Sequence, residues 1–280
     1  MSSSTNPSLV TSLDGEEYEA ELLKWKEDSY GGVIVNLEAT MDVGAFVCSL
    51  KASLSKWRHL GKKGVWMKLL IEQSHLVDAA VQEGFWYHHA EPTYLMLVHW
   101  IPNTAHTFPV NASHRVGITA FVMNDKREVL VVQEKSGKFQ GSGVWKFPTG
   151  VVDAGEDISV GVVREVKEET GINTEFVEVL GFRQAHEAFF GKSDLLFVCM
   201  LHPLTHDIVK QDAEIAHAQW MPIDEYAAQP YIQSHESFRK VADICIARMD
   251  KGYRGFSPYI AQRSFLYFNS RDLSGPSSSY

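Results

Sequence analysis

The chain has 280 residues, 45% of them hydrophobic and 22% charged, which is ordinary for a globular protein that buries a core. Its formal net charge of −9 argues against nonspecific binding to nucleic acid or to a membrane surface. The longest apolar runs fall short of the ~20 residues that a membrane-spanning helix needs, and the length favours two domains over one.

Cysteine usage and the N-terminal residues indicate a cytoplasmic protein. Cys48, Cys199 and Cys245 are dispersed and form no CxxC pair, which is typical of reduced, buried thiols and argues against a zinc site. Residues 1–28 lack the basic and apolar regions of a secretory signal, and they are too acidic for an organelle transit peptide. Because these residues are polar and aperiodic, we expect them to form a flexible tail.

The next stretch, 29–104, alternates between strand and helix patterns, which predicts a compact α/β domain. The expected elements are a strand at 30–38, a helix at 41–61, a strand at 63–71, a helix at 74–84 and a strand at 92–101. Two prolines and small polar residues interrupt the pattern at 102–115, where we place a domain boundary.

The second domain is expected over 112–252, followed by a C-terminal extension over 253–280. Its expected elements are a hairpin of 116–124 and 128–135, a basic, glycine-rich loop at 135–143, a strand at 144–152, a helix at 158–170, strands at 176–190 and 194–201, a strand running into a helix at 216–227, and an amphipathic helix at 234–249. Serine-rich residues 274–280 predict a disordered tail.

The stretch 150–172 carries glycines, carboxylates and an arginine at fixed intervals. The residues are Gly150, Glu156, Arg164, Glu165, Glu168, Glu169 and Gly171. If 158–170 is a helix, successive residues advance by about 100°, so Glu165, Glu168 and Glu169 share one edge beside an apolar face of valines. Like charges on one edge repel unless a cation lies among them.

Oxygen ligands with room for water suit Mg²⁺ or Mn²⁺ rather than zinc. Such an ion can neutralise a diphosphate and activate a water for attack on phosphorus. Arg164 can orient Glu168 as an i, i+4 pair, Gly171 suits a left-handed helix end, and Gly150 allows a tight turn before the helix. The alternative is a solvated acidic helix without metal, in which Glu156 only caps the helix start.

The spacing resembles the Nudix box of nucleoside-diphosphate-linked hydrolases at its defining positions, apolar Val166 and Ile172 included. The resemblance implies a Nudix α/β/α sandwich with a mixed sheet. It also implies Glu165, Glu168 and Glu169 as catalytic metal ligands, supported by Glu156 at the metal and by Arg164. Thr149 stands where many members of the family have glycine.

Residues outside this stretch complete the candidate site. Glu214, before the last predicted strand, is a candidate metal ligand or general base and equally an exposed loop residue. The substrate-binding candidates are Arg183, Lys146, Trp145, Phe189 and Gly150. The charged ones are individually more often surface charges, and the aromatic ones more often core residues.

The resemblance extends along nearly the whole chain to the plant cytosolic Nudix hydrolases that act on ADP-ribose and NADH. It is carried by "YGGV" at 30–33, "GKKGVW" at 61–66, "EGFWYHHAEPTYLMLVHWIP" at 83–102 and "NASHRVG" at 111–117. It implies a cytoplasmic homodimer that uses Mg²⁺ or Mn²⁺ to cleave ADP-ribose to AMP and ribose 5-phosphate, and NADH as a further substrate.

The N-terminal domain resembles part of an acetyltransferase fold. Acetyl transfer needs a glycine-rich pyrophosphate loop after the central strand, and the stretch at 97–106 has no glycine. We therefore interpret the domain as a scaffold for dimerisation and for covering the catalytic module.

The substrate rests on whole-chain similarity alone, because "EAFFGK" at 187–192 lacks the proline or tyrosine that marks other substrate classes of the family. Two alternatives stay open. The chain could hydrolyse an oxidised nucleotide or another diphosphate, or it could be a regulatory module that binds a nucleotide with little turnover.

Overall fold

The computed structural model describes residues 9–13, 16–261 and 264–270. The chain divides into two compact units, residues 1–112 and 113–280, and the division falls inside the segment 102–115 where the sequence places a domain boundary. Within the described ranges, no helix is long and apolar enough to cross a membrane.

The first unit is built around a mixed sheet with the strand order β3-β4-β5-β7-β6, in which β4 and β5 are parallel and the other neighbours are antiparallel. Its elements are β1 (Leu9–Leu13), β2 (Glu16–Ala20), β3 (Trp25–Glu27), β4 (Val33–Asn36), α1 (Val43–His59), β5 (Gly64–Leu70), a 3₁₀ helix (Ile71–Leu76), α2 (Val77–Gln82), β6 (Trp86–Glu91) and β7 (Tyr94–Trp100).

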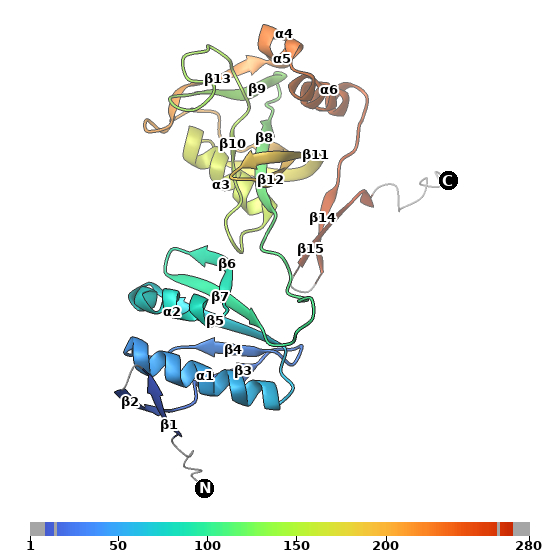
Figure 1. Cartoon of the computed structure of the whole chain (residues 1–280). Coiled ribbons are helices and arrows are strands. Elements are labelled where there is room, and N and C mark those ends of the chain that lie inside the picture. Colours follow the sequence, from blue (N-terminus) through green and yellow to red (C-terminus); the bar gives the residue numbers. More distant parts are fainter. Residues whose placement is uncertain (1–8, 14–15, 262–263, 271–280) are drawn as a thin grey trace, which may run out of the picture. The chain divides into compact units, whose positions relative to one another are not determined.

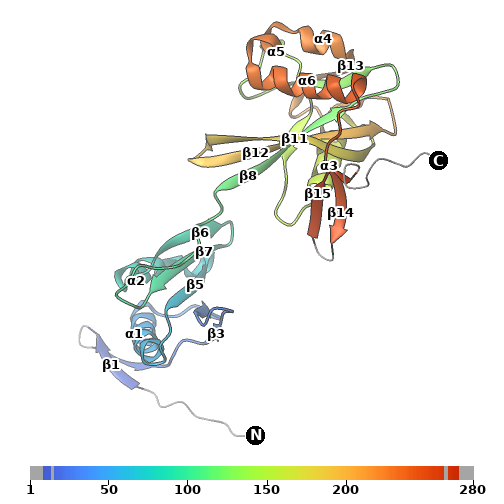
Figure 2. The ribbon, with the colours of Figure 1, turned by 90° about the vertical axis from the view of Figure 1, so that its right-hand side faces the viewer.

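The core of the first unit lies on one face of this sheet. Alternate residues of β4 and β5, such as Val33, Val65 and Met67, are buried against α1 and α2. Figure 2 shows these helices on one side of β5 and β7. The helix α1 begins at Asp42, whose carboxylate accepts hydrogen bonds from two backbone amides of the first turn, and its apolar stripe ends in the buried Trp57.

The predicted flexible tail over 1–28 is wrong for part of its length. Residues 9–13 and 16–20 form the β1–β2 hairpin, and β3 pairs with β4. Leu23 is buried in the core, and its backbone amide donates to the hydroxyl of Ser53 on α1. These strands have only five, five and three residues, too few for a clear alternating pattern. Residues 1–8 and 14–15 lie outside the described residues.

The first unit also differs from the predicted elements at its end. The helix expected over 74–84 is a 3₁₀ helix followed by the shorter α2, and the chain turns at Gly84 with a φ of 87°. The sequence misses β6, which pairs antiparallel with β7 through a turn at Pro92 and Thr93. Its exposed aromatic and histidine side chains conceal the alternation that would have indicated a strand.

The second unit contains a mixed sheet with the order β10-β8-β12-β11, in which β8 and β12 are parallel, and a separate β13-β9 pair (Figure 1). Its elements are β8 (His114–Val122), β9 (Glu128–Glu134), β10 (Thr149–Val151), α3 (Ile158–Thr170), β11 (Thr174–Phe189), β12 (Lys192–Pro203), β13 (Ile215–Pro222), α4 (Ile223–Ala228), α5 (Pro230–Ser234), α6 (Glu236–Asp250), β14 (Ser257–Ala261) and β15 (Ser264–Phe268).

Helices cover both faces of this mixed sheet. Ile118 and Ala120 of β8 pack with Val162 and Val166 of α3 on one face. Phe121, on the opposite side of β8, packs with residues of α4, α5 and α6. The arrangement confirms the predicted α/β/α sandwich with a mixed sheet in the second unit. Within it, the strand β10 lies against the helix α3.

Two predicted elements of the second unit are wrong. The turn at Asn124 forms, but β8 and β9 meet only in the isolated bridge between Met123 and Val129 and then enter different sheets. The strand expected over 144–152 is reduced to β10, because residues 144–148 run past β9 with a single bridge from Lys146 to Val132. Alternation alone does not show which long-range partner a strand takes.

The C-terminal extension is not separate from the second unit. Phe256 exchanges backbone hydrogen bonds with Val179 of β11 (2.8 and 3.0 Å), and β14 and β15 form an antiparallel hairpin beyond it. The predicted disordered tail at 274–280 lies outside the described residues.

Candidate active site

The helix α3 carries most of the candidate residues and spans the predicted residues 158–170. Its valines at 162 and 166 are fully buried against the sheet, which fixes the rotation of the helix about its axis. The helix ends at Gly171, whose φ of 76° is the left-handed conformation that glycine adopts without strain. The predicted helix end at Gly171 is therefore confirmed.

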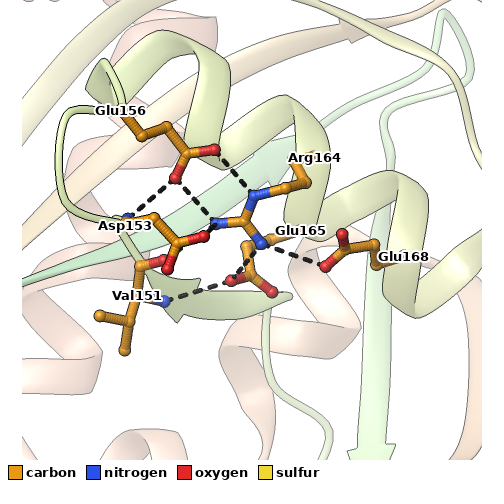
Figure 3. A network of polar contacts seen from close by, with 6 residues as sticks. All are labelled: Val151, Asp153, Glu156, Arg164, Glu165 and Glu168. Atoms are coloured by element: carbon orange, nitrogen blue, oxygen red, sulfur yellow. Dashed lines mark hydrogen bonds and ion pairs between the residues drawn. The ribbon is translucent and has the colours of Figure 1, made fainter. Parts of the chain in front are cut away.

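Arg164 is the centre of a carboxylate network (Figure 3). Its Nε and Nη2 atoms donate to the two oxygens of Glu156 at 2.8 and 2.9 Å. Its Nη1 atom donates to Glu165 at 3.0 Å and to Glu168 at 3.1 Å, so the predicted i, i+4 pair with Glu168 forms. Nη2 also donates to the carbonyl of Val151 at 3.0 Å, which ties the helix to the end of β10.

Glu156 faces Arg164 with both oxygens and also accepts from the backbone amide of Asp153 at 3.0 Å. The guanidinium lowers the pKa of Glu156 to about 2, and the same contact raises the pKa of Arg164. The alternative that Glu156 only caps the helix is wrong, because Asp157 occupies the N-cap position. Its predicted role as a metal ligand does not fit this geometry either, so Glu156 positions Arg164.

Gly150 and Glu165 are in direct contact. A Cβ atom built on Gly150 would lie 1.9 Å from the carboxyl carbon of Glu165, so no other residue fits there without moving that side chain. The prediction that Gly150 provides a tight turn is wrong, because it lies within β10 and pairs with Ile118. Glu165 also accepts from the backbone amide of Val151 at 3.3 Å, and burial raises its pKa.

Glu169 is the most buried carboxylate of the helix edge, with 6% of its surface exposed. Burial raises its pKa to about 8, an effect that nearby Lys146 opposes. Its Oε2 atom is buried and has no hydrogen-bond partner in the described part of the chain. A buried carboxylate oxygen without a partner is costly unless a cation or a ligand meets it.

The edge formed by Glu165, Glu168 and Glu169 fits a hard divalent cation by its chemistry. The donors are carboxylate oxygens, and the partnerless Oε2 of Glu169 is where such an ion would be most stabilising. Among the described residues, no three His, Cys, Asp or Glu side chains are already gathered as a metal cluster. Glu165 and Glu168 instead accept hydrogen bonds from Nη1 of Arg164.

Lys146 lies beside this edge and is largely buried. It pairs with Glu134 of β9 and donates to the hydroxyl of Thr149 at 2.8 Å. Thr149 therefore does more than alter the loop, since its side chain fixes the ammonium group next to Glu169. A charged lysine held in this way can bind an anion.

A cavity of about 260 Å³ opens from Lys146 and Thr149 toward the helix α6. It is lined by Thr119, Phe139, Lys146, Phe147, Thr149, Arg183, Leu196, Tyr226, Ser237, Phe238 and Val241. The predicted substrate-binding residues Arg183 and Lys146 thus line one cavity. Arg183 finds its charge partner in Asp194, at 3.7 Å.

The aromatic walls of this cavity are residues that the sequence analysis misses. Phe139 comes from the basic loop and contacts the ring of Phe238 on α6, with centroids 6.1 Å apart. Tyr226 of α4 stacks on Phe147, with centroids 4.2 Å apart. Because these residues lie up to a hundred positions apart in the sequence, no local spacing could reveal that they share a pocket.

Three predicted site residues do not line this cavity, although the loop of Glu214 reaches the α3 edge, where the Gln211 amide donates to the carbonyl of Glu169 at 3.0 Å. Trp145 faces His217, with ring centroids 6.4 Å apart, and lines a different depression on the surface. Phe189 lies at the tip of the β11–β12 hairpin, half exposed, under the guanidinium of Arg115. Glu214 is exposed in the loop before β13, where its backbone carbonyl accepts from the amide of Lys135 at 2.7 Å.

Comparison with known proteins gives concordant matches for both units. A family model described as the Nudix hydrolase domain matches residues 23–101, and one described as the NUDIX domain matches residues 113–241. The chain is 55% identical to Nudix hydrolase 2 of Arabidopsis thaliana over 276 residues, 97% of each chain.

More distant relatives match as well. The chain is 36% identical to the human nucleoside diphosphate-linked moiety X motif 6 over 213 residues, 73% of this chain and 66% of that protein. Among solved structures, a MutT protein from Methanosarcina mazei Go1 is 20% identical and covers 51% of this chain and 99% of its own, with a TM-score of 0.42.

The glutamate edge of α3, the arginine that holds it and the family match along nearly the whole chain lead to one conclusion. This chain belongs to the Nudix hydrolase family, the enzymes that hydrolyse the pyrophosphate bond of nucleoside diphosphate derivatives and generally use a divalent metal.

Proposed function

We propose that this Nudix hydrolase uses Mg²⁺ to cleave ADP-ribose to AMP and ribose 5-phosphate, and that it also cleaves NADH to AMP and reduced nicotinamide mononucleotide. The cavity of the second unit carries the proposal. Its polar end holds Lys146 and Thr149 beside Glu169, and its walls are aromatic. A nucleotide diphosphate offers a planar base for such walls and an anion for such an end.

Glu165, Glu168 and Glu169 would hold the metal, which when bound supplies charge neutralisation at the diphosphate and activates a water. Arg164 holds Glu165 and Glu168 on one edge, and Glu156 in turn fixes Arg164. Lys146 places a positive charge at the polar end of the cavity, where it attracts phosphate oxygens. Phe139 and Phe238 exclude water from the part of the cavity that takes the base.

The volume of the cavity supports the binding of a single nucleoside in it. A volume of about 260 Å³ lies just below the range for ligand sites, which starts at about 300 Å³, so the cavity has room for one base and ribose rather than for a whole dinucleotide. ADP-ribose and NADH share an adenosine diphosphate half that such a cavity could take. The whole-chain similarity to a plant Nudix hydrolase also supports this substrate class.

We further propose that the enzyme is a cytoplasmic homodimer and that its first unit is an acetyltransferase-like scaffold. The state of the cysteines supports the compartment, since Cys48, Cys199 and Cys245 are all free and buried. Burial also raises the pKa of the Cys199 thiol to about 12, which keeps it unreactive.

The substrate is tested by product analysis with ADP-ribose, NADH and oxidised dGTP, each with and without Mg²⁺. We expect AMP from ADP-ribose at the highest kcat/KM, a lower value for NADH, and no product without the metal. A preference for oxidised dGTP would overturn the substrate assignment. Nucleotide binding without turnover of any of the three would support a regulatory module instead.

The role of the cavity is tested by Phe238→Leu, which removes an aromatic wall and keeps an apolar residue. We expect the KM for ADP-ribose to rise by about 5-fold or more, because stacking on a base contributes ~1–3 kcal/mol. The matched control is Phe182→Leu, an exposed aromatic residue of β11 that does not line the cavity. Equal KM values in the two variants would place the base elsewhere.

A further inference from the structure

The first unit has a sheet face that its helices leave open. Since α1 and α2 pack on one face of the sheet, strand alternation turns Ile34, Trp66, Met96 and Trp100 to the other. Ile34 is the cross-strand partner of Trp66. The segment 107–109, which leads toward the second unit, crosses this face.

A cavity of about 750 Å³ lies on this face. It is lined by Asp28, Ser29, Tyr30, Gly32, Ile34, Lys63, Gly64, Trp66, Met96, Trp100, Thr107, Phe108 and Pro109. Its aromatic rings form a connected group, because the ring of Phe108 lies 5.0 Å from that of Trp66 and 5.5 Å from that of Trp100, centroid to centroid.

The position of Phe108 is fixed by the backbone beneath it. A Cβ atom on Gly64 would lie 2.8 Å from the Phe108 ring, so the ring rests against bare main chain. Trp66, Trp100 and Phe108 stay partly exposed in the cavity instead of closing over one another. Rigid, partly exposed aromatic side chains around a hollow are typical of a ligand site rather than of a core.

The rim of this cavity carries one lysine, Lys63, and one carboxylate, Asp28. Lys63 is exposed and makes no ion pair with any described residue, whereas the neighbouring Lys62 is paired with a glutamate at 2.7 Å. One oxygen of the Asp28 carboxylate accepts hydrogen bonds from the backbone amides of Tyr30 and Gly32, at 2.8 and 2.7 Å, within the turn that Asp28 begins. Lys63 therefore remains available to an anion.

We propose that this cavity is a second, non-catalytic site that binds a nucleotide, with the base against Trp66, Trp100 and Phe108 and the phosphate at Lys63. Stacking surfaces next to a free cation are the combination that recognises a planar base joined to an anion. The volume lies within the range of ligand sites. The site is distinct from the catalytic cavity, since the two share no lining residue and belong to different units.

The proposal is tested by equilibrium dialysis of the full chain with radiolabelled AMP, which counts bound nucleotide per chain. We expect one site in the second unit and another in the first. Trp66→Leu and Lys63→Glu should each weaken the first-unit site by about 10-fold or more, since one removes a stacking surface and the other a charge-assisted hydrogen bond. The kcat for ADP-ribose should not change.

The matched control is Lys56→Glu, which makes the same charge change at an exposed position of α1, away from the cavity. It should leave both AMP sites intact. Because Lys63 is a surface residue, its variant tests the site even if Trp66→Leu does not fold, and circular dichroism checks the folding of each.

A stoichiometry of one AMP per chain that Phe238→Leu weakens would overturn the proposal, as would two sites that neither first-unit variant affects. If this face instead contacts a second copy of the chain, light scattering will show Trp66→Leu converting dimer to monomer while AMP binding stays unchanged. That result too would overturn it. Failure of ADP-ribose hydrolysis is a separate readout and bears only on the catalytic site.

Discussion

Arg164 is the residue on which the candidate active site depends most. The side chains of Glu156, Glu165 and Glu168 all accept hydrogen bonds from one guanidinium group. Arg164 makes five hydrogen bonds, two to Glu156 and one each to Glu165, Glu168 and the Val151 carbonyl, whereas an ammonium group has only three donors. Arg164 thus sets the spacing of the glutamate edge without itself being a metal ligand.

We expect Arg164→Lys to lower the kcat for ADP-ribose by ~10–100-fold, the range typical when a residue that orients metal ligands is changed. The lysine keeps the charge but cannot bridge Glu156 and Glu168. The matched control is Arg127→Lys, which alters an exposed ion pair with Asp250 and should change neither kcat nor stability. Wild-type kcat in Arg164→Lys would show that the network is not needed for catalysis.

Thr149 stands where many members of the family have glycine, and in the structure its side chain contacts Lys146. Its hydroxyl accepts from Lys146 beside Glu169. Thr149→Val keeps the shape and removes the hydroxyl, so we expect the KM for ADP-ribose to rise several-fold, consistent with the loss of one hydrogen bond worth ~1 kcal/mol. Steady-state kinetics of Thr149→Ser, which restores the hydroxyl, should return to wild type. If Ser and Val behave alike, Thr149 does not position Lys146.

At this scale the sequence predicts the glutamate edge well, because helical periodicity is local and the valines fix the rotation of α3. It predicts the location of the Trp145 side chain poorly, for a physical reason. Residues 144–148 are not a regular strand, so alternation does not tell which side Trp145 faces. It places Glu156 among the metal ligands because spacing cannot show that both oxygens of its carboxylate meet Arg164.

At the scale of elements, the contact between β10 and α3 holds the site together. Gly150 and Glu165 touch at a place where a Cβ would overlap the carboxyl group, and the carbonyl of Val151 accepts from Arg164. The strand thus approaches the glutamate edge of the helix more closely than a residue with a Cβ at position 150 would allow.

We expect Gly150→Ala to push the Glu165 side chain off the edge. The added methyl group should lower the free energy of unfolding by about 1–3 kcal/mol, as overpacking does, and should also lower kcat. Urea unfolding and steady-state kinetics measure the two effects. The matched control is Gly181→Ala in β11, where the nearest atom to a Cβ would be 3.8 Å away. If both variants have wild-type stability and activity, the contact between Gly150 and Glu165 tolerates an added methyl group.

The elements that the sequence predicts best are those whose pattern is complete in itself, such as α3 and α6. Those whose pairing it predicts wrongly depend on distant partners. The strands β8 and β9 have the alternation of a hairpin, yet β8 pairs with β12 and β10 while β9 pairs with β13. The pairing that forms is the one that buries both faces of the sheet, and no single segment contains that information.

At the scale of the whole molecule, the chain places two cavities of different character in two units. The cavity of the second unit is lined by residues of the mixed sheet and of α6, and it holds Lys146, which lies near Glu169. The cavity of the first unit has aromatic rings and a free lysine with no glutamate edge beside it. Under the two proposals above, hydrolysis belongs to the second unit and nucleotide recognition without hydrolysis to the first.

The sequence predicts the division into units because prolines and small polar residues mark the segment between them. It does not predict the cavity of the first unit. Trp66 and Trp100 lie in two predicted strands and Phe108 lies in the predicted boundary segment, and only the register of β5 with β7 and the path of 107–109 bring them together.

The most direct test of the account is the rate of AMP release from ADP-ribose during a Mg²⁺ titration, for the wild type and for Glu169→Gln. Glutamine keeps the shape of Glu169 and removes its charge. We expect a saturable dependence on Mg²⁺ in the wild type and a rate at least about 100-fold lower in the variant, since metal-based stabilisation of the transition state is worth several kcal/mol. Full activity of the wild type in EDTA, or a wild-type rate in Glu169→Gln, would contradict the assignment of the α3 edge as the catalytic metal site.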